Sequence, residues 1–351
     1  MTRRENGFGH LGLLFGLILV AGLMFFAYTR INKSEVALDT AKQSAPSKTP
    51  FSFTAAGDFN STAGADLVLT GIGQEKSDFT LAFGDLGYGG NGKETAWCDF
   101  VKARVGPEHP FELIAGNHDD GSVDGNITEY AKCLPDRIGN ITGNYGTEYY
   151  FDFGNMARFI MISPDINTYG FDYSEGDSGG AHLQWVIDVV KDAQSKNIDW
   201  IVVGMHKNCI TIGEKTCEIG TDLLNNLVDL KVDLVLQGHE HAYFRSKQLA
   251  LSPDTCPAIV VNEFNQSCIA KDGDKLQKGA GTIIVISGAG GAELRDVSLQ
   301  DSEIGYFSSL NGKNVGNSHG YSLFDVREKT IKASFVPVDG SFTDSFSISA
   351  N

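Results

Sequence analysis

Short apolar runs rich in β-branched residues recur along the chain, and each ends in a turn with a polar residue. Five of them occupy residues 51–56, 79–83, 111–115, 200–205 and 232–237. Each run is short enough to form a buried strand. Three later runs, at 282–287, 321–326 and 332–336, lack polar clusters at their ends, and we expect structural strands there.

Helical periodicity lies between the later strands. Apolar residues spaced three and four apart occur at Leu183, Val186, Ile187 and Val190, and again at Leu223, Leu224, Leu227 and Val228. This spacing predicts helices with one buried stripe. Strands that alternate with helices predict an α/β fold, in which a two-sheet β-sandwich is flanked by helices.

The N-terminal part has a different pattern. Residues 11–28 are apolar or small and uncharged, and about 18 residues at ~1.5 Å each span roughly the core of a bilayer. Arg3 and Arg4 precede this segment and favour a cytoplasmic N-terminus. We therefore expect one N-terminal transmembrane helix, a signal anchor at 11–29, after a cytoplasmic tail at 1–10 and before a polar tether at 30–50. A cleaved signal peptide is the alternative, and either interpretation places the catalytic domain, 51–351, outside the cell.

The net charge of the chain limits the kinds of ligand that it could bind. The net charge of −16 argues against a nucleic-acid-binding surface, which needs clustered lysine and arginine. An anionic substrate must then be attracted locally, by a metal or a helix end.

The six cysteines form no C-x-x-C pair, and an exported domain favours disulfides. Of about 15 connectivities we expect the sequential one, and free buried thiols are the alternative. It pairs Cys98 with Cys133, Cys209 with Cys217, and Cys256 with Cys268. The second pair would close a small loop just after His206, where it would either hold a wall of the pocket or serve as a general staple.

Polar residues that bind metals follow the five apolar runs. In open α/β sheets, ligands collect outside the carboxyl ends of the strands. Aspartate, asparagine, histidine and tyrosine together form a mixed oxygen and nitrogen set, which suits iron, manganese or zinc. Two such metals clamp both the attacking and the leaving oxygen of a phosphoryl transfer. The pattern therefore predicts a dinuclear metal site.

These residues form five blocks, GDFN (57–60), GDLGY (84–88), GNHD (116–119), VGMH (203–206) and GHEH (238–241). The series resembles the signature of calcineurin-like metallophosphoesterases. Tyr88 in the second block, and Ala242, Tyr243 and Arg245 after the fifth, make it most similar to the purple acid phosphatase branch. The blocks occur in family order from residue 57 to residue 241. The resemblance implies the four-layer sandwich of this superfamily.

The resemblance also implies a role for each matched residue. The ligands of the first metal would be Asp58, Tyr88 and His241, and those of the second would be Asn117, His206 and His239. Asp85 would bridge the two metals. A tyrosine phenolate favours Fe(III) at the first position, beside a divalent iron, manganese or zinc ion.

Four further residues receive roles from the same resemblance. His118 would bind the phosphate or protonate the leaving oxygen, and Asp119 would orient His118. Arg245 would belong to the layer around the ligands. Asn60 stands where the branch usually has glycine and the wider superfamily has a ligating histidine. Its amide either reaches the first metal or caps a turn.

The implied function is hydrolysis of phosphomonoesters outside the cell, by attack of a metal-bound hydroxide on a small phosphorylated substrate. A phosphodiesterase or nucleotide hydrolase with the same site is one alternative, because loop shape decides between these activities. The segments 87–102, 119–149 and 167–180 are long enough to set this choice. A non-catalytic surface protein that keeps the fold is the other alternative. The N-terminal helix would make the membrane a partner.

Overall fold

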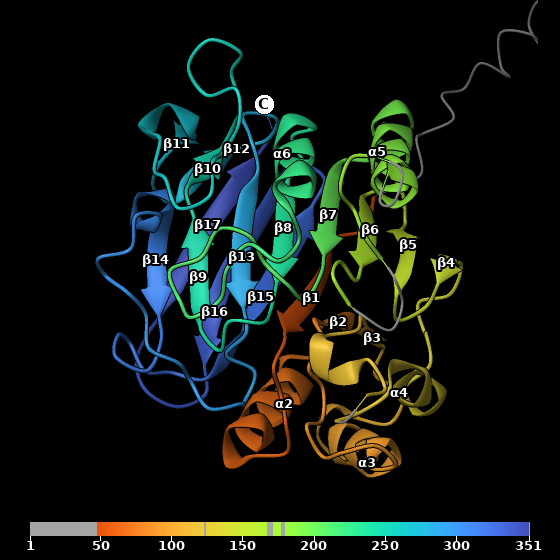
Figure 1. Cartoon of the computed structure of the whole chain (residues 1–351). Helices are drawn as coiled ribbons and strands as arrows, with labels where there is room; N and C mark the ends of the chain where they lie inside the picture. Colours follow the sequence, from red (N-terminus) through yellow and green to blue (C-terminus); the bar gives the residue numbers. More distant parts are fainter. Residues whose placement is uncertain (1–47, 123, 167–170, 177–179, 351) are drawn as a thin grey trace, which may run out of the picture. The chain divides into compact units, whose positions relative to one another are not determined.

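The computed structural model describes residues 48–122, 124–166, 171–176 and 180–350 (Figure 1). The predicted cytoplasmic tail, the signal anchor and most of the tether lie outside these residues. Within the described part of the chain, no helix is both long enough and apolar enough to cross a bilayer. The anchor at 11–29 therefore stays a prediction. Residues from Lys48 onward form one structural unit.

The first sheet is mixed, with seven strands in the order β12-β17-β16-β15-β1-β2-β3. Parallel strands β1, β2 and β3 span Phe51–Ala56, Phe79–Ala82 and Phe111–Leu113. Antiparallel strands β15, β16 and β17 span Gly320–Arg327, Thr330–Pro337 and Asp344–Ser349. Strand β12 (Lys275–Gln277) pairs in parallel with β17 at the edge.

The second sheet has eight strands in the order β14-β9-β13-β8-β7-β6-β5-β4. Its parallel centre consists of β6 (Ala157–Ile162), β7 (Trp200–Gly204), β8 (Leu234–Gln237) and β13 (Ile283–Ser287). Its antiparallel margins are β4 (Thr142–Asn144), β5 (Glu148–Phe153), β9 (Tyr243–Ser246) and β14 (Phe307–Asn311). Strands β10 (Gln248–Leu249) and β11 (Ile269–Lys271) form a small separate ribbon.

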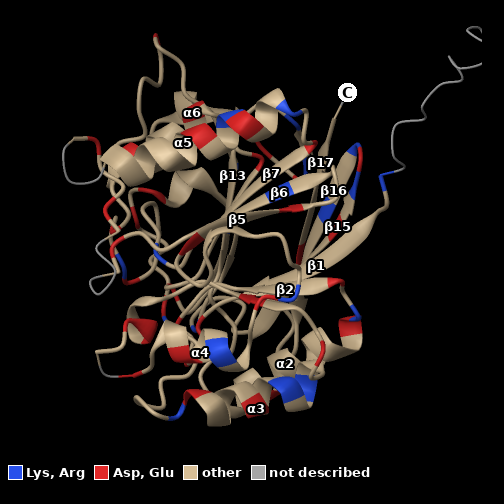
Figure 2. Ribbon diagram, turned by 90° about the vertical axis from the view of Figure 1, so that its right-hand side faces the viewer, with Lys and Arg blue, Asp and Glu red and all other residues tan. Residues whose placement is uncertain are grey.

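Helices cover the outer faces of both sheets. The first sheet is covered by α2 (Ala63–Glu75), α3 (Glu94–Val105) and α4 (Ile127–Cys133), and the second by α5 (Gly180–Ser195) and α6 (Thr221–Asp229). Short 3-10 turns are η1 (Asn117–Asp119), η2 (Gln266–Cys268) and η3 (Ile304–Tyr306). Acidic and basic residues are intermixed along these helices (Figure 2).

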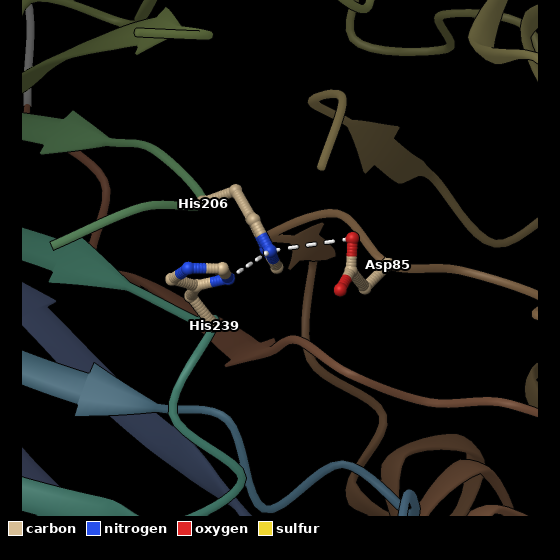
Figure 3. Close-up of side chains that lie close together, drawn as sticks. All are labelled: Asp85, His206 and His239. Carbon is tan, nitrogen blue, oxygen red and sulfur yellow. Dashed lines mark hydrogen bonds and ion pairs between the residues drawn. The ribbon is translucent and has the colours of Figure 1, made fainter. Parts of the chain in front are cut away.

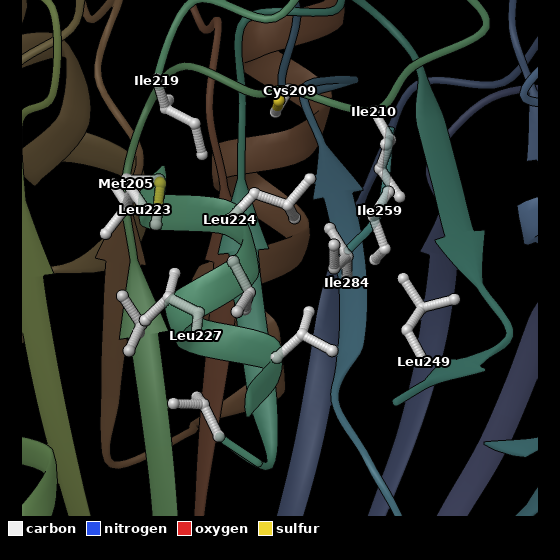
Figure 4. Packing of buried hydrophobic residues seen from close by; sticks show 14 of the residues in the cluster. Met205, Cys209, Ile210, Ile219, Leu223, Leu224, Leu227, Leu249, Ile259 and Ile284 are labelled. Carbon is white, nitrogen blue, oxygen red and sulfur yellow. The ribbon is translucent and has the colours of Figure 1, made fainter. Parts of the chain in front are cut away.

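The core between the sheets is aromatic. Phe53 of β1 and Phe79 of β2 stack at 5.3 Å, and Phe159 of β6 meets both rings edge-on at 5.1 and 5.2 Å. On the far side of the second sheet, the predicted stripe of α6 is buried, with Leu223 and Leu227 among its residues (Figure 4). The predicted two-sheet sandwich flanked by helices is therefore confirmed for the described residues.

The disulfide prediction is also confirmed. Cys98 bonds to Cys133, Cys209 to Cys217, and Cys256 to Cys268. The first bond ties α3 to the end of α4, and the second closes a loop that follows β7.

Candidate metal centre

The predicted ligands follow strand ends that meet at one edge of the sandwich. Strand β1 is followed by Asp58, β2 by Asp85 and Tyr88, β3 by Asn117, β7 by His206, and β8 by His239 and His241. The loops after β1 and β2 run side by side, with Asp58 N donating to Gly84 O at 3.1 Å. The carboxyl ends of the parallel strands of both sheets thus supply one cluster.

Two glycines allow these loops to touch. Gly84 has a φ of 73°, and a Cβ there would overlap the backbone of Gly116. A Cβ on Gly116 would overlap the Asp85 carboxylate. Larger residues at these positions would push the loops after β2 and β3 apart, and would separate Asp85 from Asn117.

The first group of ligand atoms surrounds the Tyr88 hydroxyl. This oxygen lies 2.9 Å from Asp85 Oδ2, 3.2 Å from His241 Nε2 and 3.5 Å from Asp58 Oδ1. His241 Nε2 lies 3.5 Å from Asp58 Oδ1. One hydroxyl proton therefore faces three acceptors.

The second group surrounds His206 Nε2. This nitrogen lies 3.0 Å from His239 Nδ1, 3.2 Å from Asn117 Oδ1 and 3.2 Å from Asp85 Oδ1. The ligand atoms of Asp85, His206 and His239 all lie within 4.8 Å of one another, and the three side chains converge in Figure 3. Asp85 offers one oxygen to each group, which is the geometry of a bridging carboxylate.

Each of the three histidines uses its other ring nitrogen on a protein acceptor. His206 Nδ1 lies 2.6 Å from Phe83 O, His241 Nδ1 lies 2.9 Å from Glu293 O, and His239 Nε2 lies 2.9 Å from Glu218 Oε1. These nitrogens hold the proton that faces away from the cluster, so each ring presents its other nitrogen to the cluster and offers a lone pair there when it is neutral. Once Tyr88 and His206 give up their protons, the converging oxygen and nitrogen atoms all carry lone pairs, and this set fits two metals of intermediate hardness.

The pKa values agree with this fit. Burial raises the pKa of Asp58 well above its ordinary value. Burial also opposes the ionisation of Asp85, but His206 lowers the pKa of that carboxyl below its usual range. Against burial, the Asp85 and Asp58 carboxylates raise the pKa of His206 to about 9. A cation bound here would displace the His206 proton and would stabilise both carboxylates.

His118 and Asp119 depart from the expected pairing. His118 Nδ1 lies 2.6 Å from Asp124 Oδ2, so Asp124 orients the ring. Asp119 is fully buried, and its carboxylate accepts backbone N–H bonds from Asp85 at 2.6 Å, Leu86 at 3.0 Å and Gly116 at 2.9 Å. The predicted role of Asp119 is therefore corrected, because both of its oxygens bind the loops that carry the ligands.

The expected role of Arg245 is corrected as well. Its guanidinium bonds to Asp344 at 2.7 and 2.9 Å and to Asp274 at 2.8 Å, so it joins β9 to the other sheet. Asn60 has a φ of 64°, and its side-chain oxygen accepts from Ser61 N at 2.7 Å. This contact is local to the turn, and ligation of the first metal by Asn60 stays a prediction.

Sequence reasoning missed Asp124, Glu218 and Arg295 as neighbours of the centre. Arg295 donates to His239 O at 3.1 Å. The expected Cys209–Cys217 loop was a usable signal for Glu218, because that residue follows Cys217 directly. Asp124 and Arg295 lie in loops without any comparable pattern.

Comparison with known proteins places this centre in a family. Residues 53–243, more than half of the chain, match the calcineurin-like phosphoesterase family. An uncharacterized protein of Mycobacterium tuberculosis is 28% identical over 289 residues, which are 72% of this chain and 53% of that protein. Probable purple acid phosphatase 20 of Arabidopsis thaliana is 24% identical over 232 residues, which are 62% of this chain and 52% of that protein.

The fold is shared with purple acid phosphatase PPD1 from yellow lupin seeds, with a TM-score of 0.65 and 19% identity over 87% of this chain and 54% of that chain. The structure of PhoD superimposes with a TM-score of 0.55 and 14% identity, over 87% of this chain and 71% of that chain. The chain spans about half the length of the curated relatives it matches. It belongs to the calcineurin-like phosphoesterase family, as its five blocks predict, and purple acid phosphatases are among its relatives.

Proposed function

We propose that this protein is a dinuclear-metal hydrolase of phosphomonoesters that acts outside the cell. The observation that carries the proposal is the convergence of seven ligands in two groups that share Asp85. When bound, two metal ions would activate water and neutralise the charge of the phosphate. Tyr88 favours Fe(III) in the first group, and a divalent iron, manganese or zinc ion suits the second.

His118 is the candidate for proton transfer. Its side chain is 35% exposed, and its ring packs 4.5 Å from that of Tyr88, at the rim of the first group. Asp124 accepts from Nδ1, and Nε2 faces the centre, 3.9 Å from Asp85 Oδ2, where it could meet a substrate oxygen. In this position His118 would bind the phosphate or protonate the leaving oxygen.

The disulfides support the proposed location. Three bonds that join all six cysteines are typical of domains that fold in an oxidising compartment. The predicted anchor at 11–29 would hold such a domain at the membrane, and cleavage after it would release the domain.

Hydrolysis of diesters is a second candidate, supported by a cavity beside the second group. This cavity has a volume of about 290 Å³, and its lining includes Ile166, Tyr173, Glu218 and Ile219. Glu218 stands between this cavity and His239, because it contacts the ring nitrogen that faces away from the cluster. A diester would reach the cavity with a second ester group that extends past His239.

Metal content and the visible spectrum, measured on one sample of the full chain, test the proposal. About two metals per chain and a band in the purple region are expected, and the Tyr88→Phe substitution should remove the band. Two metals without colour would support manganese or zinc. Absence of metal after reconstitution would contradict the enzyme and favour a non-catalytic surface protein. Rates on p-nitrophenyl phosphate and its bis ester then separate monoesterase from diesterase.

A further inference from the structure

We propose that Glu218 is a positioning residue, which holds His239 in the orientation that the second metal needs. The inference rests on the proposed function, because it requires a metal in the second group. It concerns a residue outside the five blocks, contributed by the loop after β7.

The contacts form a short chain of charges behind the ligand. Glu218 Oε1 lies 2.9 Å from His239 Nε2, and Glu218 Oε2 lies 2.8 Å from Lys207 Nζ. Lys207 also binds Asp165 at 2.6 Å. The His239 side chain is 2% exposed and that of Lys207 is 9% exposed, whereas Glu218 is 24% exposed. The carboxylate is thus clamped between a buried ring and a nearly buried ammonium.

This contact selects one orientation of the ring. With Nε2 on the carboxylate, Nδ1 lies 3.0 Å from His206 Nε2, inside the second group (Figure 3). A flipped ring would turn a carbon toward Glu218 and lose the bond. A carboxylate on the far nitrogen also makes a histidine a stronger metal ligand.

The loop that carries Glu218 is itself fixed. The Cys209–Cys217 bond closes it, and Glu218 N donates to Asn208 O at 3.0 Å. Glu240 lies in sequence between the ligands His239 and His241, and its fully buried carboxylate accepts from Thr211 Oγ1 at 2.8 Å and Lys215 N at 2.7 Å. The loop is therefore anchored on the segment that carries the ligands, so Glu218 has a defined place.

Asp165 provides the matched control. Its carboxylate lies 2.6 Å from Nζ of Lys207, the same lysine that Glu218 binds. Substitution of Asp165 by asparagine removes one negative charge beside Lys207 and leaves the contact between Glu218 and His239 intact. A general effect of charge at Lys207 would appear in both variants, whereas a positioning effect would appear only in the Glu218 variants.

The test measures Zn²⁺ and Mn²⁺ binding to the full-length protein by calorimetry and equilibrium dialysis. We expect Glu218→Ala to weaken one of the two sites by about 10- to 100-fold and to leave the other unchanged. Glu218→Gln, which keeps an acceptor oxygen, should lie between that variant and the wild type. Asp165→Asn should bind both metals like the wild type.

A second readout follows the ring directly. In protein labelled with ¹⁵N-histidine and free of metal, we expect the His239 signals to show a single Nε2-protonated form, and Glu218→Ala to broaden or shift them. Thermal unfolding of each variant checks the fold. Two metals bound equally tightly by the wild type and Glu218→Ala would overturn the inference, as would equal weakening in Asp165→Asn. A wild type that binds no metal would instead overturn the proposed function.

Discussion

Asp119 provides a sharp test of the centre, because the structure gives it a role that differs from the one implied by its motif. The perturbation is Asp119→Ala. Its carboxylate accepts three backbone N–H bonds, from Asp85, Leu86 and Gly116. The residue is fully buried, so water does not replace these bonds without rearrangement. We expect a loss of folding stability that accompanies any loss of activity.

The expected magnitude follows from the bonds. Each buried N–H left without a partner costs about 1–3 kcal/mol, so three of them cost roughly 3–6 kcal/mol after partial relaxation. A typical domain has about 5–15 kcal/mol of stability in total. Asp119→Ala would thus remove a large part of the free energy of unfolding. Asp119→Asn keeps one acceptor oxygen and should cost about 1–3 kcal/mol.

Urea denaturation of both variants and of the wild type, followed by circular dichroism, measures these losses. Metal content, measured on the same samples, reports whether Asp85 stays in place. The reasoning is refuted if Asp119→Ala is less than about 1 kcal/mol less stable than the wild type, since even one buried unpaired N–H should cost that much. Loss of turnover at unchanged stability would restore the role that the motif implies, in which Asp119 acts on His118.

Three other substitutions probe separate parts of the structure. Asp124→Asn removes the carboxylate from His118, so kcat should fall roughly 10- to 100-fold. The urea concentration at the midpoint of unfolding should stay the same. An unchanged kcat would exclude this contact from catalysis. Burial raises the pKa of Glu112 to about 8. The contribution of this carboxyl to the free energy of unfolding is therefore complete below about pH 4.5. It is lost as pH rises toward 8, at about 1.4 kcal/mol per pH unit and by a few kcal/mol in total. Glu112→Gln should flatten that slope in urea titrations at pH 5 and pH 8, and equal slopes would contradict the assignment. Gly116→Ala would press a Cβ against Asp85. We therefore expect about 1–3 kcal/mol of destabilisation and a lower metal content by elemental analysis. A metal content equal to that of the wild type would argue against this packing.

The strands that carry the ligands were predictable because each lies in a mostly apolar run that is followed by a turn with a polar residue. The predicted run 51–56 matches β1 (Phe51–Ala56), and the run 232–237 contains β8 (Leu234–Gln237). Strands buried on both faces have this composition. Strand β5 (Glu148–Phe153) was missed, because it buries Tyr149 and Phe151 while Asp152 between Phe151 and Phe153 is exposed. Its alternating pattern lacks the apolar run that marks the others.

The contacts behind the ligands were less predictable, for a physical reason. A residue such as Asp85 reaches the centre from a strand end, and its position follows from local sequence and sheet geometry. Asp124 reaches His118 across a loop, and Glu218 reaches His239 from a different strand connection. Which carboxylate meets which ring then depends on tertiary packing. The family resemblance implied that Asp119 orients His118, but the backbone of η1 directs Asp119 inward.

Backbone strain links the ligands to the carboxylates around them. Asp58, Asp85, Tyr88 and His239 have φ values of 59°, 50°, 47° and 70°, in the left-handed region. Each such residue costs on the order of 1 kcal/mol, and surrounding contacts must hold it there. Asp119 holds the amide of Asp85, and Asp58 accepts from the amide of His239 at 2.8 Å. A carboxylate here supports a neighbouring ligand as well as binding a cation. Variants of Asp119 should therefore lower stability and metal content together, whereas those of Asp124, which holds only a side chain, should lower turnover alone.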